Sequence, residues 1–175
     1  MWVSALILIL LLLSESGYLQ AKEIRVAVAS NFKAAMISVA RHFEAISDHK
    51  VTLIFGSTGK HYAQIKNGAP YDVFFAADSH RPQRLEEEGI ALPNSRFTYA
   101  RGRIVLWSPK VDFIDSSETV LKNGEFRFLA LANPRLAPYG NAAKEVLTGL
   151  QLWDSLVGKM VRGENISQTF QFVKS

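Results

Sequence analysis

The sequence contains no cysteine in its 175 residues, which excludes disulfide bonds, thiolate metal sites and cysteine nucleophiles. Its 20 Lys and Arg residues are scattered rather than clustered, so no segment has the positive charge density of a nucleic-acid surface, and we expect no nucleic-acid partner. Internal repeats and low-complexity segments are also lacking. With 48% hydrophobic and 21% charged residues, the composition is that of a globular protein with one or two domains.

Long hydrophobic runs are scarce, and the clearest one covers residues 5–13 near the amino terminus. This run is too short to cross a bilayer as a helix, but it has the length of the apolar core of a secretory signal. A small residue, Ala21, follows at the expected distance. We therefore predict that residues 1–21 are a signal peptide and that the remaining chain is exported. An uncleaved membrane anchor is the alternative.

After residue 22, apolar strands alternate with amphipathic helices. Strands are predicted at residues 23–29, 50–55, 71–76, 104–107, 126–132 and 159–162. Helices are predicted at residues 32–46, 61–66, 78–89, 117–121, 141–150 and 166–173, with a further turn at 153–156. This order predicts an α/β fold with mainly parallel sheets flanked by helices. A change of character after Pro93 places lobe 1 at residues 22–97 and lobe 2 at residues 98–175.

The first strand is apolar on both faces and runs into Ser30 and Asn31, after which an Ala-rich helix follows. A hydroxyl at such a turn lies beside the unpaired N–H groups of the first helical turn. It can either cap the helix or help to hold an anion. Both interpretations of Ser30 are open on this stretch alone.

Three further strand-to-helix turns have the same small and polar character, at Ser57 and Thr58, at Tyr139, and at residues 163–166. Ligands of open parallel sheets lie beyond the carboxyl ends of the strands, so these turns can converge on one crevice. They offer neutral donors and no titratable base. The set therefore favours binding an anion over attacking a substrate.

Enzymatic alternatives find less support. The segment 56–60 has two residues between its glycines, where a phosphate-binding P-loop needs four. No Gly-x-Ser-x-Gly elbow of a hydrolase is present. The histidines lie in polar segments and are expected at the surface, although His61, on the helix after the second turn, could instead rim the site. Asp78 is expected to cap a helix rather than bind a metal. The four histidines are His42, His49, His61 and His80.

Four segments in order resemble the periplasmic molybdate-binding proteins of ABC importers, which have the type II periplasmic-binding-protein fold. These segments are residues 26–36 (VAVASNFKAAM), 55–60 (FGSTGK), 68–78 (GAPYDVFFAAD) and 132–143 (ANPRLAPYGNAA). The resemblance covers roughly residues 22–173. It implies two lobes, each with a mainly parallel sheet flanked by helices.

The resemblance also implies a binding site and a role. It implies that a tetrahedral oxyanion is held by Ser30, Thr58, Tyr139 and the N–H of Ile166, with Asn31 contributing through its backbone and Ser57 lying beside the contact residue. The implied protein is a periplasmic monomer without enzymatic activity or cofactor. It captures molybdate or tungstate, with no protein ligand on molybdenum itself, and delivers the ion to the membrane permease of an ABC transporter.

Two other functions stay open from the sequence, a binder of sulfate or phosphate and a secreted hydrolase-like enzyme. The chain also departs from the family at its end, because it stops at Ser175. Family members continue through a further strand, which in many carries another ligand-binding tyrosine, and then return to the first lobe. We therefore expect a truncated member with two incomplete lobes and reduced ligand affinity and stability.

Overall fold

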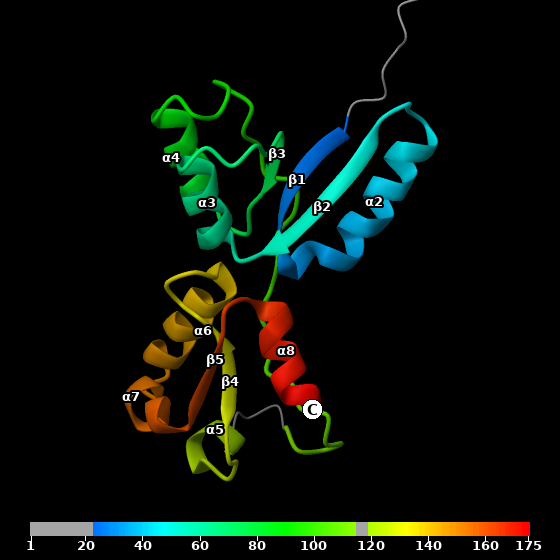
Figure 1. Ribbon diagram of the computed structural model, residues 1–175. Helices are drawn as coiled ribbons and strands as arrows, with labels where there is room; N and C mark the ends of the chain where they lie inside the picture. Colours follow the sequence, from blue (N-terminus) through cyan, green and yellow to red (C-terminus); the bar gives the residue numbers. More distant parts are fainter. Residues whose placement is uncertain (1–22, 115–118) are drawn as a thin grey trace, which may run out of the picture.

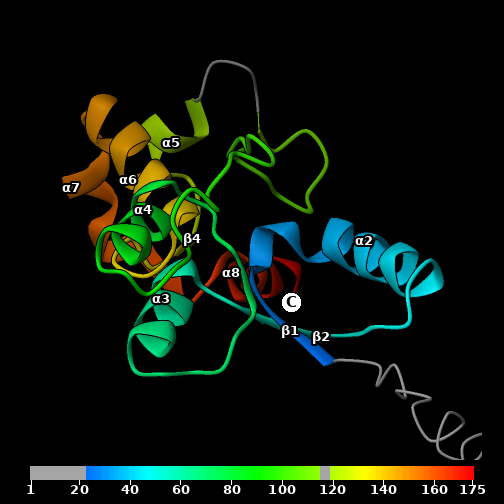
Figure 2. The same ribbon diagram turned by 90° about the horizontal axis from the view of Figure 1, so that it is seen from above.

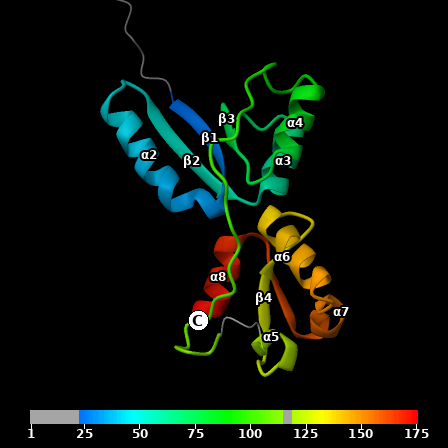
Figure 3. The ribbon, with the colours of Figure 1, turned by 180° about the vertical axis from the view of Figure 1, so that it is seen from behind.

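The computed structural model describes residues 23–114 and 119–175. Figure 1 shows two parts, which we call lobe 1, from β1 to α4 (residues 23–87), and lobe 2, from α5 to α8 (residues 119–174). An extended segment connects them (Figure 3), and the predicted boundary between residues 97 and 98 stays a prediction. The predicted signal peptide and the first two residues of the predicted helix 117–121 lie outside the described residues.

Lobe 1 is built on a three-stranded parallel sheet. β1 (Glu23–Ala29) lies between β2 (Lys50–Gly56) and β3 (Val73–Phe75), in the order β2-β1-β3. β1 has neighbouring strands at both edges and helices on both faces, and its four residues from 26 to 29 are buried. The predicted parallel arrangement of the first three strands is confirmed.

Helices cover both faces of this sheet. η1 (Ser30–Phe32) leads into α2 (Lys33–Ala45), which lies on one face, where Met36 packs against Val26 and Val28. α3 (Thr58–Lys66) and α4 (His80–Glu87) lie on the other side, as Figures 1 and 2 show. The start of each helix that follows β1 or β2 therefore lies at the carboxyl edge of the sheet.

Lobe 2 has a two-stranded parallel sheet formed by β4 (Leu129–Ala132) and β5 (Met160–Gly163). Its helices are α5 (Thr119–Asn123), α6 (Pro138–Gly149), α7 (Trp153–Leu156) and α8 (Ile166–Lys174), with the short η2 (Val157–Lys159) before β5. Leu121, Leu147 and Leu156 form its buried core. In neither lobe is a described helix long and apolar enough to cross a membrane.

The strand predicted at residues 104–107 is wrong, because this segment is coil. A strand needs a neighbouring strand for its backbone hydrogen bonds, and among the described residues this segment pairs with none. Its side chains are correspondingly open to solvent, with Val105 82% exposed. The segment borders a largely apolar cavity of about 510 Å³ beside β4.

Several element bounds also differ from the predictions. The helix predicted at 141–150 begins at Pro138, whose fixed φ suits the first helical turn, so Tyr139 lies inside α6 rather than before it. The strands predicted at 71–76 and 126–132 are shorter and begin at Val73 and Leu129. The helix predicted at 78–89 ends before Gly89, whose φ of 71° stops a helix.

Candidate functional site

The carboxyl ends of the strands in the two lobes face each other where the lobes meet (Figure 1). Each of these strands leads into a helix start: β1 into η1, β2 into α3, β4 into α6 and β5 into α8. Helix starts carry backbone N–H groups without intrahelical acceptors and the positive end of the helix dipole. All six sequence-predicted residues lie at these four helix starts.

Ser30 joins the lobes directly. It is 8% exposed and is the first residue of η1, whose N-cap is Ala29, so the alternative that Ser30 caps its own helix is wrong. Its Oγ accepts the N–H of Ser167 at 3.4 Å, and its carbonyl accepts the Ser167 hydroxyl at 3.3 Å. Asn31 beside it is exposed. Ser30 is thus hydrogen-bonded to the residue that follows Ile166, another of the predicted site residues.

Ser57 and Thr58 are buried at the start of α3, with 2% and 0% exposure. Ser57 is the N-cap, and its Oγ accepts the N–H of Lys60 at 3.4 Å. The Thr58 Oγ1 accepts the N–H of Ala77 at 3.0 Å, which ties the end of β3 to the start of α3. Both hydroxyls therefore bond within lobe 1.

The three hydroxyls share a feature that matters for ligand chemistry. Ser30, Ser57 and Thr58 each use an oxygen lone pair to accept a backbone N–H. A hydroxyl has one hydrogen of its own besides its lone pairs, and acceptance leaves this hydrogen to be donated. The arrangement presets all three groups as donors, which suits an anion.

Tyr139 and Ile166 contribute through helix starts. Ile166 opens α8, whose N-cap Asn165 accepts the N–H of Gln168 at 3.1 Å through its side chain. Tyr139 lies in the first turn of α6, so its N–H has no intrahelical acceptor. Its hydroxyl points toward the connecting segment and lies against Gly102. The side chain of Tyr139 thus contacts the connecting segment, whereas its backbone N–H is the candidate ligand donor.

Tyr99, in the connecting segment, packs against lobe 1. Its ring packs on Phe32 and Phe75 with centroid distances of 4.9 and 5.1 Å, and its hydroxyl donates to the Ala76 carbonyl at 2.7 Å. Burial raises the pKa of the Tyr99 phenol, and the neighbouring Tyr139 raises it further. The hydroxyl therefore stays protonated and keeps this hydrogen bond throughout the neutral range.

The Gly102→Ala substitution is expected to lower stability by about 1 kcal/mol, because the added Cβ would overlap the Tyr139 hydroxyl and displace the ring. Urea denaturation measures the loss. The double variant Gly102→Ala with Tyr139→Phe removes the offending oxygen and should recover part of the stability. Equal stability of Gly102→Ala and the unaltered protein would contradict this contact.

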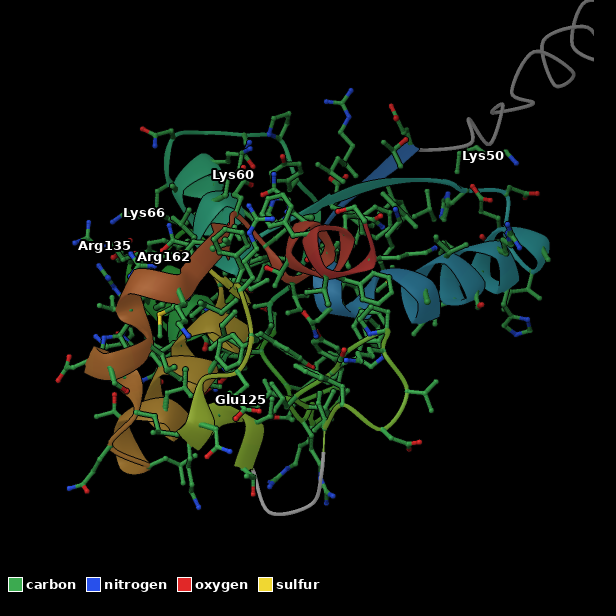
Figure 4. All side chains as sticks on the ribbon, turned by 90° about the horizontal axis from the view of Figure 1, so that it is seen from below. Lys50, Lys60, Lys66, Glu125, Arg135 and Arg162 are labelled. Atoms are coloured by element: carbon green, nitrogen blue, oxygen red, sulfur yellow. The ribbon has the colours of Figure 1, made fainter. Side chains whose placement is uncertain are left out.

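The charged side chains near these hydroxyls bond to other protein groups. Lys60 pairs with Glu164 across the lobes at 3.3 Å, and Arg81 donates to the Arg135 carbonyl at 3.1 Å. Figure 4 shows Lys60 and Arg135 on the same side of the molecule, with Arg162 beside them. Because Lys60 already has a carboxylate partner and is half exposed, the neutral donors remain the candidate ligand groups.

Two hollows border the predicted residues. One, of about 460 Å³, is lined by Ser30, Lys33, Phe55, Glu164, Asn165, Ser167, Gln168 and Gln171. The other is the apolar cavity of lobe 2, which Tyr139 and Ile166 reach. Ser57 and Thr58 line neither hollow. The structure therefore groups the predicted residues at one lobe junction without placing all of them around a single cavity.

Sequence reasoning missed three residues at this junction. Ser167 and Gly59 make inter-lobe hydrogen bonds, and the polar position after Ile166 and the glycine after Thr58 were the available signals. His61 was predicted at the surface but is 2% exposed, so that prediction is wrong. Its spacing of three from Thr58, on one helical face, was the signal.

The other predictions about titratable residues mostly hold. His42 and His80 are exposed as predicted, whereas His49 is half-buried. Asp78 accepts the N–H of Arg81 at 2.9 Å at the start of α4, which is a capping hydrogen bond, although the N-cap residue itself is Ser79. Within residues 23–114 and 119–175, no group of three or more His, Asp or Glu could hold a metal ion.

Comparison with known proteins gives consistent results. The family model described as bacterial extracellular solute-binding protein matches residues 24–175. The molybdate-binding protein ModA of Azotobacter vinelandii is 50% identical over 154 residues, covering 88% of this chain and 61% of the relative. The ModA protein of Rhodobacter capsulatus is 43% identical over 152 residues, covering 87% and 60%. The chain thus spans about three fifths of the length of these relatives.

A solved structure is also similar. The periplasmic molybdate-binding protein of Azotobacter vinelandii superposes with a TM-score of 0.83 and 42% identity, covering 86% of this chain and 66% of that one. This likeness confirms the predicted α/β class, with parallel sheets flanked by helices as in the type II periplasmic-binding-protein fold.

Proposed function

Since the chain belongs to the bacterial extracellular solute-binding protein family, we propose that it captures a fully ionised tetrahedral oxyanion, molybdate or tungstate, at the junction of its lobes. The observation that carries the proposal is the set of preset hydroxyl donors at Ser30, Ser57 and Thr58. The N–H groups of Tyr139 and Ile166, with the backbone at Asn31, complete the set from the neighbouring helix starts.

Neutral donors are strong enough for this task. A hydrogen bond to a charged group contributes about 1.5–3 kcal/mol, so four contribute roughly 6–12 kcal/mol before the costs of closure and ordering. Micromolar binding requires about 8 kcal/mol. A site of this kind therefore needs neither a cationic side chain on the ion nor a cofactor.

The donor set also separates the candidate anions. Phosphate keeps at least one proton at neutral pH, because its last ionisation lies far above neutrality, and that proton needs an acceptor. Molybdate, tungstate and sulfate carry no proton there, which fits donors alone. Sulfate is smaller and remains the alternative within the class. The names of the relatives at 50% and 43% identity favour molybdate, and tungstate has the same charge and shape.

The family description also supports the wider role. We infer that the protein works outside the cytoplasm as a monomeric periplasmic carrier and delivers its ion to the membrane permease of an ABC transporter. Relatives named as binding proteins favour capture over hydrolysis. Turnover of an ester that is lost in Ser30→Ala would favour the hydrolase alternative instead.

A thermal-shift screen of the purified protein tests the ligand. Molybdate and tungstate are expected to raise the melting temperature, because a ligand that binds only the folded state at 100 times its Kd adds about 2.7 kcal/mol. Sulfate and phosphate at the same concentration serve as controls and should have little effect. A rise in melting temperature with sulfate alone would identify sulfate, not molybdate, as the ligand. No rise with any of the four ions would refute oxyanion binding by this chain.

A further inference from the structure

His61 is the one buried histidine of lobe 1 among the described residues. It lies on α3, three residues after the candidate site residue Thr58. Its ring meets Tyr71 and Phe74 edge-on, with centroid distances of 5.8 and 6.3 Å. Only 2% of the residue is exposed. Placing a polar ring in such an apolar setting costs free energy unless its nitrogens find partners.

The partners of His61 belong to the segments that end at the site. The ring Nε2 lies 3.3 Å from the carbonyl oxygen of Val28, two residues before Ser30 on β1. The backbone N–H of His61 donates to the carbonyl of Ser57 at 3.1 Å. The same residue therefore contacts the chain leading to Ser30 and the start of α3.

The ring also fixes the end of β2. A Cβ atom added to Gly56 would lie 2.9 Å from Nε2 of His61, so the imidazole packs against the backbone just before Ser57. The ring is thus wedged between the carboxyl ends of β1 and β2. A shift of this ring would move Ser30 relative to Ser57 and Thr58.

Hydrogen bonding and not charge makes these contacts. A carbonyl can only accept, so Nε2 carries the proton toward Val28. Nδ1 lies 3.2 Å from Oε1 of Gln64, which accepts the Tyr71 hydroxyl at 3.1 Å. A ring protonated only on Nε2 has no proton to donate to that oxygen, so its one ring hydrogen bond is the one to Val28. Burial lowers the pKa of His61, and the charged groups near it, Lys60 and Glu164, pair with each other. The ring is therefore neutral at neutral pH.

We propose that His61 is a positioning residue for the oxyanion site, holding the Ser30 turn and the Ser57–Thr58 turn at the separation that the ion requires. This inference rests on the proposed function. It predicts that the hydrogen bond to Val28, and not merely the volume of the ring, sets the affinity, since displacing site groups by a fraction of an ångström weakens a preorganised site.

Isothermal titration of the purified protein with molybdate tests this role through two variants. His61→Leu fills the space but loses the donor, and its Kd should rise about tenfold. His61→Gln places an amide N–H near the position of Nε2 and should stay within about threefold of the unaltered protein. His42→Leu, at an exposed position on α2, is the matched control and should not change the Kd.

The proposal is overturned if His61→Leu binds molybdate as tightly as the unaltered protein, or if His61→Gln binds it as weakly as His61→Leu. It is also overturned if the affinity rises between pH 8 and pH 6.5 only when His61 is present. The last would show that charge and not position matters. If the unaltered protein binds no molybdate, the proposed function fails separately. Amide chemical shifts of Ser30 and Thr58 then decide, because His61→Leu must move both and His61→Gln must leave them nearly unchanged.

Discussion

Ser30→Ala is expected to weaken molybdate binding by roughly 10- to 150-fold, the equivalent of one hydrogen bond to a charged group. The hydroxyl has two functions, since its oxygen accepts the Ser167 N–H from lobe 2 at 3.4 Å while its hydrogen is left for the ion. Alanine removes the donor and the bond from the Ser167 N–H, while the bond from the Ser167 hydroxyl to the carbonyl of residue 30 remains. Isothermal titration of the purified protein measures the change.

The matched control is Ser79→Ala, which removes an exposed hydroxyl that makes no capping hydrogen bond at the start of α4. Its affinity should equal that of the unaltered protein. Circular dichroism melts should show both variants folded, because Ser30 contributes no cap to its own helix. Unchanged affinity in Ser30→Ala, with both proteins folded, would remove Ser30 from the site.

Substitutions at Thr58 are expected to change stability as well as molybdate affinity. Thr58→Val keeps the shape but loses the hydroxyl, which leaves the N–H of Ala77 without its acceptor and should lower both affinity and stability. Thr58→Ser retains the hydroxyl and should largely restore both. A Thr58→Val variant with lower stability but unchanged affinity would assign Thr58 a purely structural role.

The sequence predicted the strand-to-helix turns of this site better than their contacts. Local apolar patterns marked β1 and β2, and the polar residues after them marked the turns, because both signals lie within a few neighbouring residues. The choice for Ser30 between capping its helix and holding an anion stayed open on its own stretch of sequence, because the contact that distinguishes them is with Ser167, 137 positions away. No local pattern contains that information.

The failures have the same origin. Residues 104–107 have a strand-like composition, but a strand forms only where a neighbour pairs with it, and among the described residues this segment has no such neighbour. His61 lies in a polar stretch of sequence, yet the packing of α3 on β1 buries it. Burial of a polar residue is decided by tertiary contacts, whereas composition reports only the average tendency.

Gly59→Ala is expected to force the lobes apart and to weaken molybdate binding by about a hundredfold, since small displacements of positioning groups have effects of that order. Gly59 donates its N–H to the Leu136 carbonyl at 2.8 Å, across the junction between α3 and the segment before α6. A Cβ at this position would lie 2.8 Å from that oxygen and 3.1 Å from the Leu136 Cα. Both are backbone atoms, so no side chain can turn away to make room.

The weaker molybdate binding expected for Gly59→Ala cannot be attributed to a less stable α3 helix. Gly59 lies within α3 and has no positive φ, and alanine favours a helix over glycine by about 1 kcal/mol. Lobe 1 alone should therefore become no less stable, and any loss must come from its contact with lobe 2. Gly149→Ala, at the end of α6 with no atom near the added Cβ, is the matched control.

Small-angle scattering and titration together separate the possible results. A larger radius of gyration and a weaker Kd in Gly59→Ala, with Gly149→Ala unchanged in both, would show that the close approach of Gly59 to Leu136 closes the site. An unchanged radius with a weaker Kd would limit the effect to the turn around Thr58. If neither quantity changes, the lobe junction at Gly59 makes no contribution to oxyanion binding.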